Sequence, residues 1–424
     1  MEDVNIQAYK RFAMYRLGLI KLKYDLTLVG ICCLITAFVL SGFTSSTFAL
    51  DRDAGGVQVG PAKAYPSITL SARHDDNLFR TDTDEESTLI GIVAPAVRFA
   101  LQDNIKKATL DYGIEAGFHE DSSPDDYVDQ KLLGVFSYHP TDRIRTELRG
   151  EYLDEHDERG TERTEGTGGF LLDPDEWHSL GIGGLLSYGT PNATGRVELE
   201  ASYVDKEYDN NRRVTFTRDR SDLDLRGTFF YRIGPKTELL FEYKQTDFEY
   251  DATAVGEPTL DSTNRDYLFG VTWDATYKTT GVAKFGYQEK DFDSSLRNDD
   301  DNPAWEIGVI WRPRSYSIVE IFTESRHDET NGIGDSIEVS EFTASWDHQW
   351  RDHISSTVKF LYGEDDYNDA IREDDRINAG IRLNYDWRRW ARISAGYLYD
   401  ERDSDISFFD YERNLFDITL NLKL

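Results

Sequence analysis

The last nine residues of the chain alternate strictly between apolar and polar side chains. From Phe416 to Leu424, every even-numbered residue is apolar and every odd-numbered residue is polar. A period of two indicates a β-strand with one apolar face and one polar face. The chain stops at this strand, so we expect the strand to pair with the first one. In a membrane, such closure is how a sheet satisfies its edge groups. The pattern therefore predicts a closed β-barrel.

The composition fits a barrel wall whose two faces differ. Of the 424 residues 39% are hydrophobic and 13% are aromatic, and the mean hydropathy is -0.58. These values resemble those of a soluble chain, but a barrel strand alternates its faces, so its average hydropathy stays low. The formal net charge of -32 argues against nucleic acid as a partner.

The N-terminus has the pattern of a secretory signal. Five basic residues precede an apolar run over residues 26–43, and a small-residue end, Thr47-Phe48-Ala49, follows it. We predict a signal peptide over residues 1–49, starting at Met1 or Met14 and cleaved after Ala49. The alternative is a single transmembrane helix, since the run approaches the length that spans a bilayer.

Both cysteines of the chain, Cys32 and Cys33, lie inside this apolar run. Cleavage after Ala49 would leave a mature chain without cysteine. Such a chain suits an oxidising compartment, where stray thiols are a liability. A lipoprotein signal at Cys32 fits less well, because the bulky Ile31 precedes it.

The rest of the sequence predicts a periplasmic lead-in segment over residues 50–66 and a repeating strand pattern over residues 67–424. Short turns alternate with long acidic loops. The turns lie at 102–104, 139–141, 190–192, 233–235, 275–278, 312–314, 349–351 and 387–389, and most contain Pro, Gly, Asn or Asp. The loops lie at 75–86, 120–126, 154–176, 209–220, 251–265, 291–302, 328–335, 364–375 and 400–413. Together they predict an all-β, up-and-down antiparallel transmembrane barrel of about eighteen strands, with both ends on the periplasmic side.

Two rows of aromatic residues favour a membrane over a soluble sheet. One row precedes the short turns: Tyr138, Tyr188, Tyr231, Trp273, Trp311, Trp346 and Trp387. The other precedes the loops: Phe118, Tyr152, Tyr203, Tyr243, Tyr287, Tyr362 and Tyr397. Two aromatic belts that flank an apolar band are typical of barrels in the outer membrane. A soluble β-sandwich would also alternate its faces, so it remains the alternative.

If the apolar face meets lipid, the polar face lines the lumen. The predicted lining residues are Arg145, Glu147, Arg149, Glu151, Arg196, Glu198, Glu200, Glu242, Lys244, Arg382 and Asn384. Eighteen strands enclose more space than side chains fill, so we expect a water-filled lumen unless a loop folds inward. Loop 154–176 is the candidate plug, because it contains the apolar patch Phe170-Leu171-Leu172. The lining could equally be a solvated wall without selectivity.

Catalytic and metal sites are weakly supported. The histidines are scattered over turns and loops, outside any recognisable motif: His74, His119, His139, His156, His178, His327, His348 and His353. The acidic run Asp299-Asp300-Asp301-Asn302 could hold a divalent cation, but it lacks the spacing of a calcium loop. We therefore expect no enzyme activity, no cofactor and no metal. A carboxylate protease site at the rim is the alternative, because barrel enzymes exist.

The segment Asp75-Asp76-Asn77-Leu78-Phe79-Arg80 carries a family resemblance. This Asp-Asp-Asn-apolar-aromatic-Arg sequence, with Pro95-Ala96-Val97-Arg98, resembles the Putative beta-barrel porin 2 family over about residues 65–424. Members accompany exopolysaccharide gene clusters, so the resemblance implies polysaccharide export across the outer membrane of a Gram-negative bacterium. One departure is the final Leu424, where many such strands end in an aromatic residue.

The expected function is a passive conduit for a secreted polysaccharide. A porin for small hydrophilic solutes is the alternative, and the polymer's identity and charge stay open. The expected partners are outer-membrane lipid, the transported polysaccharide or solute, and separate periplasmic export proteins.

Overall fold

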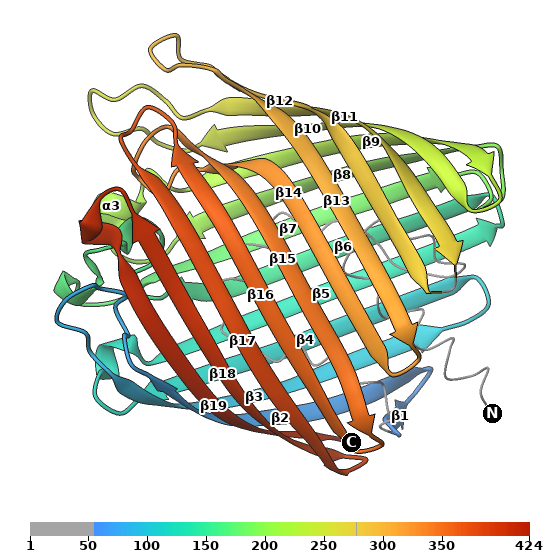
Figure 1. Ribbon diagram of the computed structural model, residues 1–424, viewed down its shortest axis with the longest axis horizontal. Helices are drawn as coiled ribbons and strands as arrows, with labels where there is room; N and C mark the ends of the chain where they lie inside the picture. The colour runs from blue at the N-terminus through green and yellow to red at the C-terminus, as the bar shows by residue number, and fades with distance from the viewer. Residues whose placement is uncertain (1–54, 277) are drawn as a thin grey trace.

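The computed structural model describes residues 55–276 and 278–424, in which eighteen antiparallel strands form one closed barrel (Figure 1). The strands are β2 (Ala62–Asp75), β3 (Thr88–Gln102), β4 (Lys106–His119), β5 (Tyr127–Thr141), β6 (Ile144–Asp157), β7 (Asp175–Tyr188), β8 (Gly195–Tyr208), β9 (Arg220–Gly234), β10 (Thr237–Tyr250), β11 (Ser262–Thr276), β12 (Thr279–Phe292), β13 (Asp300–Arg314), β14 (Ser317–Glu329), β15 (Ser336–Arg351), β16 (Ile354–Tyr367), β17 (Glu373–Arg388), β18 (Ala391–Ser404) and β19 (Tyr411–Lys423). The predicted eighteen-stranded barrel is confirmed. The signal peptide predicted over residues 1–49 lies outside the described residues.

The terminal strand closes the barrel as its alternation predicts. Strand β19 pairs antiparallel with β2 from Leu415 opposite Asp75 to Lys423 opposite Ser67. At the end of this ladder the Leu424 amide donates to the Pro66 carbonyl oxygen at 3.1 Å. Strand β2 itself begins at Ala62 and also pairs with the short strand β1 (Val57–Val59). The first barrel strand thus starts within the segment read as the lead-in.

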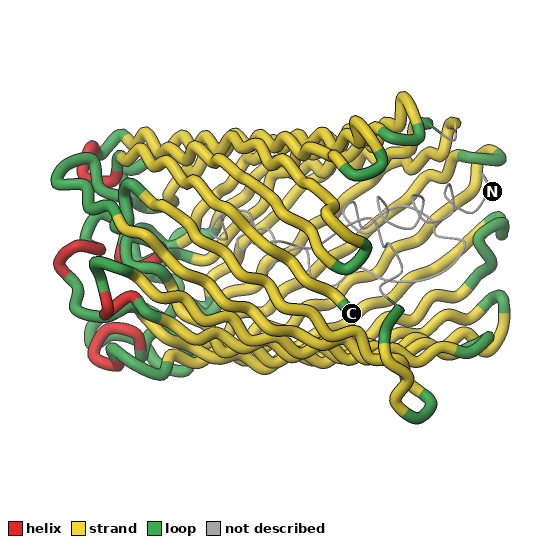
Figure 2. The backbone as a smooth tube through the Cα atoms, turned by 90° about the horizontal axis from the view of Figure 1, so that it is seen from below, coloured by secondary structure: helices red, strands yellow, loops and turns green. Residues whose placement is uncertain are grey.

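The two ends of the barrel differ in their connections (Figure 2). Short turns lie at one end, and long loops lie at the other. Strand β19 follows a long loop and therefore runs toward the short-turn side. The loops carry the helical turns η1 (Ser123–Asp125), η2 (Glu162–Thr164), η3 (Gly168–Phe170), α3 (Arg212–Thr215) and η4 (Ser407–Phe409). Within residues 55–276 and 278–424, no helix is long and apolar enough to cross a membrane.

Several turns lie about two residues later than the sequence predicts. The predicted turn at residues 139–141 belongs to the end of β5, and the chain turns at Asp142 and Arg143. The register shifts between Tyr138 and Thr141, and similar shifts precede the turns after β11, β13, β15 and β17. A bulge adds an unpaired residue and lets a strand hold proline, which lacks an N–H donor. Pro140 therefore marks a bulge and not the turn.

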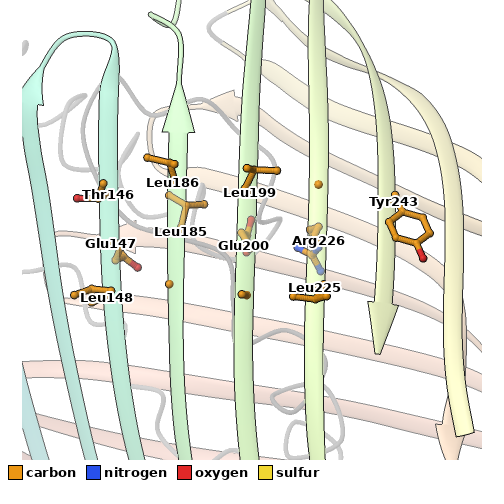
Figure 3. A pocket seen from close by; sticks show the side chains of 13 residues that line it. Thr146, Glu147, Leu148, Leu185, Leu186, Leu199, Glu200, Leu225, Arg226 and Tyr243 are labelled. Carbon is orange, nitrogen blue, oxygen red and sulfur yellow. The ribbon is translucent and has the colours of Figure 1, made fainter. Parts of the chain in front are cut away.

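The outer face of the barrel is apolar and flanked by aromatic residues. Both predicted aromatic rows contribute exposed side chains: Tyr188, Tyr231, Trp311 and Trp387 near the turns, and Phe118, Tyr152, Tyr203 and Tyr287 near the loops. On β6 to β10 this face holds a shallow depression of about 670 Å³ (Figure 3). Gly184, Ala201 and Gly227 leave this room between leucine side chains.

Neighbouring residues on β8 test which face meets lipid. The Leu199 side chain is 52% exposed, whereas Glu198 and Glu200 are buried on the opposite face. We expect Leu199→Arg to impair assembly, since an arginine on the lipid face near mid-bilayer costs about 2–4 kcal/mol. Glu200→Gln should assemble normally. The measurement is the folded fraction on unboiled gels, and equal effects of the two changes would contradict this assignment of faces.

Candidate functional site: the lumen and its mouth

The eleven predicted lining residues lie on the face opposite the exposed apolar side chains. On β6, Arg145, Glu147, Arg149 and Glu151 alternate with residues such as Leu148 and Tyr152, which are exposed on the outer face. The other lining residues follow the same alternation on β8, β10 and β17: Arg196, Glu198, Glu200, Glu242, Lys244, Arg382 and Asn384.

Many of these charges are paired, either within one strand or with a strand two positions away. Arg145 Nη2 lies 2.6 Å from Glu198 Oε1, and Arg382 Nη2 lies 2.8 Å from Asp417 Oδ1. Sequence reasoning missed Lys284, whose Nζ lies 2.8 Å from Glu242 and 2.9 Å from Glu306. Such pairs satisfy the charged groups of the wall with partners from the wall itself. The wall is thus a lattice of alternating charge rather than a field of one sign.

The Asp75–Arg80 motif lies where the first and last strands meet. Asp75 is fully buried and accepts hydrogen bonds from Arg413 of β19, with Nε 3.0 Å from both carboxylate oxygens. Asp76 accepts from the backbone amide of Asn414 at 2.6 Å and from its side-chain Nδ2 at 2.8 Å. Asn77 donates to the Glu412 carbonyl oxygen at 2.8 Å. The motif therefore holds β2 and β19 together at the loop end of the seam.

Arg80 connects this seam to the loop between β6 and β7. Its backbone is in the left-handed region, with φ of 50°, and its Nη2 lies 2.6 Å from Glu158 Oε2. Arg413 Nη1 lies 3.6 Å from the same oxygen. We call residues 158–174, which begin at this carboxylate, the lid.

The lid is anchored across the mouth of the barrel by Glu165. Its Oε2 accepts from Arg372 Nη2 at 2.8 Å and from Asn331 Nδ2 at 2.9 Å, and its Oε1 accepts from Arg402 Nη2 at 2.8 Å. Arg372 lies between β16 and β17, which stand nearly opposite β6 and β7 in the closed order of strands. The lid thus reaches over the lumen from one side to the other.

Arg159 fixes the near side of the lid. Its guanidinium donates from Nε to Asp125 Oδ1 at 2.8 Å and from Nη1 to the Leu171 carbonyl oxygen at 2.5 Å, and it stacks 4.4 Å from the Phe79 ring. The next residue, Gly160, has φ of +90°, and a Cβ there would lie 2.1 Å from the Phe79 carbonyl oxygen. Only glycine fits this close approach.

Loop 154–176 covers the mouth for a different reason than its apolar patch suggested. The predicted loop does cover the mouth, but the apolar patch does not hold it there: the Phe170 and Leu172 side chains are 85% and 83% exposed. Carboxylates and Arg159 anchor the lid instead. Sequence reasoning missed Glu158, Glu165, Arg372, Arg402 and Arg413, because their partners are far away in the sequence.

The other candidate sites serve as local anchors. Asp299 Oδ1 accepts from the Phe292 amide at 2.9 Å, and Asp300 Oδ2 lies 2.8 Å from His327 Nε2. His156 Nδ1 lies 2.9 Å from Asp129 Oδ1. Among the described residues, no group of three or more His, Cys, Asp or Glu side chains is placed to hold a metal ion.

Five aromatic side chains lie at strand ends on the loop side of the barrel, and we call this set the mouth ring: Tyr208, Tyr250, Phe292, Tyr367 and Tyr411. A cation lies over each ring. Lys206 is 4.9 Å from the centroid of Tyr208, Arg220 is 5.9 Å from that of Tyr250 and Lys290 is 5.3 Å from that of Phe292. Arg372 and Arg402 lie 4.2 and 5.3 Å from the centroids of Tyr367 and Tyr411. Cation–π contacts of this kind hold the cationic groups in place.

The lid carboxylates differ in how easily they ionise. Burial disfavours the ionised form of Glu158, but Arg80 and Arg413 outweigh burial and hold the pKa of this carboxyl below its usual value. Burial and then Asp157 raise the pKa of Glu162, although Arg218 opposes them. A depressed pKa means that the Glu158 contact stabilises the closed lid above the ordinary pKa of glutamate and is lost only in stronger acid.

A closed antiparallel barrel with an apolar outer band, aromatic belts and a charged lumen defines an outer-membrane β-barrel. The sequence matches the family described as Putative beta-barrel porin 2 over residues 52–424. The chain belongs to this family, as the resemblance of its first strands implied.

The chain also matches several solved structures at low sequence identity. OpdL of Pseudomonas aeruginosa is 12% identical, with a TM-score of 0.48, over 86% of this chain and 100% of that chain. The iron transporter FrpB of Neisseria meningitidis is 9% identical, with a TM-score of 0.47, over 84% and 64% of the two chains. The ferric enterobactin receptor PfeA of P. aeruginosa is 6% identical, with a TM-score of 0.45, over 85% and 80%. No curated protein matches the sequence.

Proposed function

We propose that this barrel is a passive conduit for the export of an exopolysaccharide across the outer membrane of a Gram-negative bacterium. The long loops then face the exterior, and the short turns face the periplasm, where separate export proteins deliver the polymer. The proposal includes no catalytic step and no cofactor, because a conduit needs only a wetted path and an exit.

The mouth ring is the observation that carries this proposal. A sugar chain presents apolar C–H faces and hydroxyl groups, and the mouth ring offers aromatic side chains next to hydrogen-bonding groups at the loop end of the barrel. The Tyr208 hydroxyl donates to Asp157 at 3.0 Å, and the Tyr250 hydroxyl donates to Glu329 at 2.6 Å. Such hydroxyls can exchange partners with a sugar without covalent chemistry. The association of the family with exopolysaccharide clusters supports the same direction of transport.

Deletion of the gene tests the proposal. We expect the deletion strain to retain the enzymes of polymer synthesis but to lose surface polysaccharide, and the full-length gene to restore it. A Tyr208→Ala/Tyr411→Ala variant that still assembles should secrete less polymer. The matched control is Tyr188→Ala, which removes an exposed tyrosine from the outer face.

A porin for small hydrophilic solutes is the second candidate. The internally paired charges of the wall favour it, because a wall of both signs gives a general aqueous path little preference for either sign. If the deletion strain secretes normal polymer and loses uptake of a small solute, export is wrong and the porin function stands.

A further inference from the structure

We propose that the transported substrate carries carboxylate groups, and that these groups open the barrel by replacing the lid carboxylates on the arginines of the mouth. This inference rests on the proposed function and specifies the polymer as an acidic, uronate-like polysaccharide. The lid would then occupy the arginines that bind the substrate until the polymer arrives.

The first argument is the placement of charge on the lid. Three carboxylates, Glu158, Glu162 and Glu165, each bind arginine side chains from other parts of the mouth. Their partners come from widely separated elements: Arg80 and Arg413 at the seam, Arg218 before β9, Arg372 before β17, and Arg402 on β18. An acidic segment thus lies across a circle of cationic groups, which is the arrangement that an acidic polymer would adopt.

The second argument is that two of these arginines have hydrogen-bonding capacity to spare. Arg372 Nη1 and Arg80 Nη1 are buried, and neither has a hydrogen-bond partner among the residues that the structure describes. The guanidinium presents five donors in a planar fork suited to carboxylates. Leaving such donors buried and unused costs free energy. An incoming carboxylate can use them, which the lid in its closed position does not.

The third argument is that the same arginines touch the mouth ring. The Arg372 guanidinium lies between the rings of Tyr367 and Phe409, 4.2 and 3.8 Å from their centroids, and directs Nη2 at Glu165. Arg402 lies over Tyr411 and directs its own Nη2 at the same carboxylate. A uronate sugar combines two matching groups, a carboxylate for the arginine edge and hydroxyl groups for the tyrosine hydroxyls of the mouth ring.

Replacement of this kind is balanced, because one carboxylate substitutes for another on the same arginines. Arg372 and Arg402 also pair with Asp374, so each keeps one carboxylate partner throughout, and the incoming carboxylate restores the one that Glu165 gives up. A neutral sugar offers no such exchange, and it would have to break the Glu165 contacts without replacing them.

The test uses the full-length protein in planar lipid bilayers, with oligogalacturonate and a maltodextrin of the same length added on the turn side. We expect oligogalacturonate to raise the open fraction of the wild-type channel severalfold and maltodextrin to leave it unchanged. Glu165→Gln should raise the open fraction without any sugar. The matched control is Glu176→Gln, which changes an exposed carboxylate next to the lid.

The arginines are tested by two double variants, one that removes their charge and one that keeps it. Arg372→Gln/Arg402→Gln should abolish the response to oligogalacturonate, and Arg372→Lys/Arg402→Lys should retain part of it. Equal responses of the wild-type channel to both sugars would overturn the inference, as would a Glu165→Gln channel that behaves like wild type.

The inference and the proposed function fail in different ways. If the deletion strain lacks surface polymer while both sugars act alike on the channel, export stands and carboxylate recognition is wrong. If oligogalacturonate alone opens the channel while the strain secretes normal polymer, carboxylate recognition stands and export is wrong.

Discussion

Arg413→Met is expected to destabilise the barrel more than any other single substitution at the seam. Arg413 is buried at the loop end of β19, where it pairs with the fully buried Asp75 and approaches Glu158. Removing one partner of a buried ion pair leaves an uncompensated charge and costs about 3–5 kcal/mol. Because β2 and β19 are the first and last strands of the barrel, the lost stability weakens the strand pairing that closes it. The measurement is the midpoint of unfolding in denaturant, together with the temperature at which the folded band disappears on gels.

The control for Arg413→Met is Arg98→Met. Arg98 pairs with Asp111 on neighbouring strands, but its side chain is 61% exposed. Exposed pairs of this kind contribute about 0–1 kcal/mol, so the control should shift the midpoint little. Similar shifts for the two variants would show that the Asp75–Arg413 pair does not hold the seam.

The architecture was predictable because barrel strands follow a local rule. Alternation in stretches such as Phe416–Leu424 gives each strand its two faces, and the change from short turns to long loops gives strand number and direction. The turn positions were less predictable, since a bulge such as that near Pro140 depends on pairing with the next strand. Register across two strands is not a property of either one alone.

The contacts at the mouth of the barrel could not be predicted from the sequence. Loop 154–176 was identified by its length, but its apolar patch gave the wrong anchor, because hydrophobicity alone does not show whether a patch faces protein or solvent. Glu165 contacts Arg372 and Arg402, more than two hundred residues away in the chain. Its role depends on closure of the barrel, which brings these residues together. The motif Asp75–Arg80 was found as a family feature, and only the structure shows its contacts with Arg413 and Glu158.

Removal of the lid is expected to increase single-channel conductance severalfold. The lid spans the mouth from Arg80 and Arg413 on one side to Arg372 and Arg402 on the other. A variant in which a short Gly-Ser turn replaces residues 158–174 keeps all of β6 and β7. Because an eighteen-stranded barrel is wider than its side chains can fill, the exit should then be open. Conductance in planar bilayers measures this change directly.

Shortening the loop between β10 and β11 provides the control for removal of the lid. Residues 253–256 are exposed, and Val255 among them is fully exposed to solvent. Their removal should leave conductance unchanged, since they are exposed and belong neither to the lid nor to the mouth ring. The lid variant must also retain its folded band on unboiled gels, because Asp75 still pairs with Arg413 when Glu158 is gone. A folded variant without the lid whose conductance equals that of the full-length channel would show that the lid does not limit the pore, and the constriction would then lie at the charged wall around Lys284.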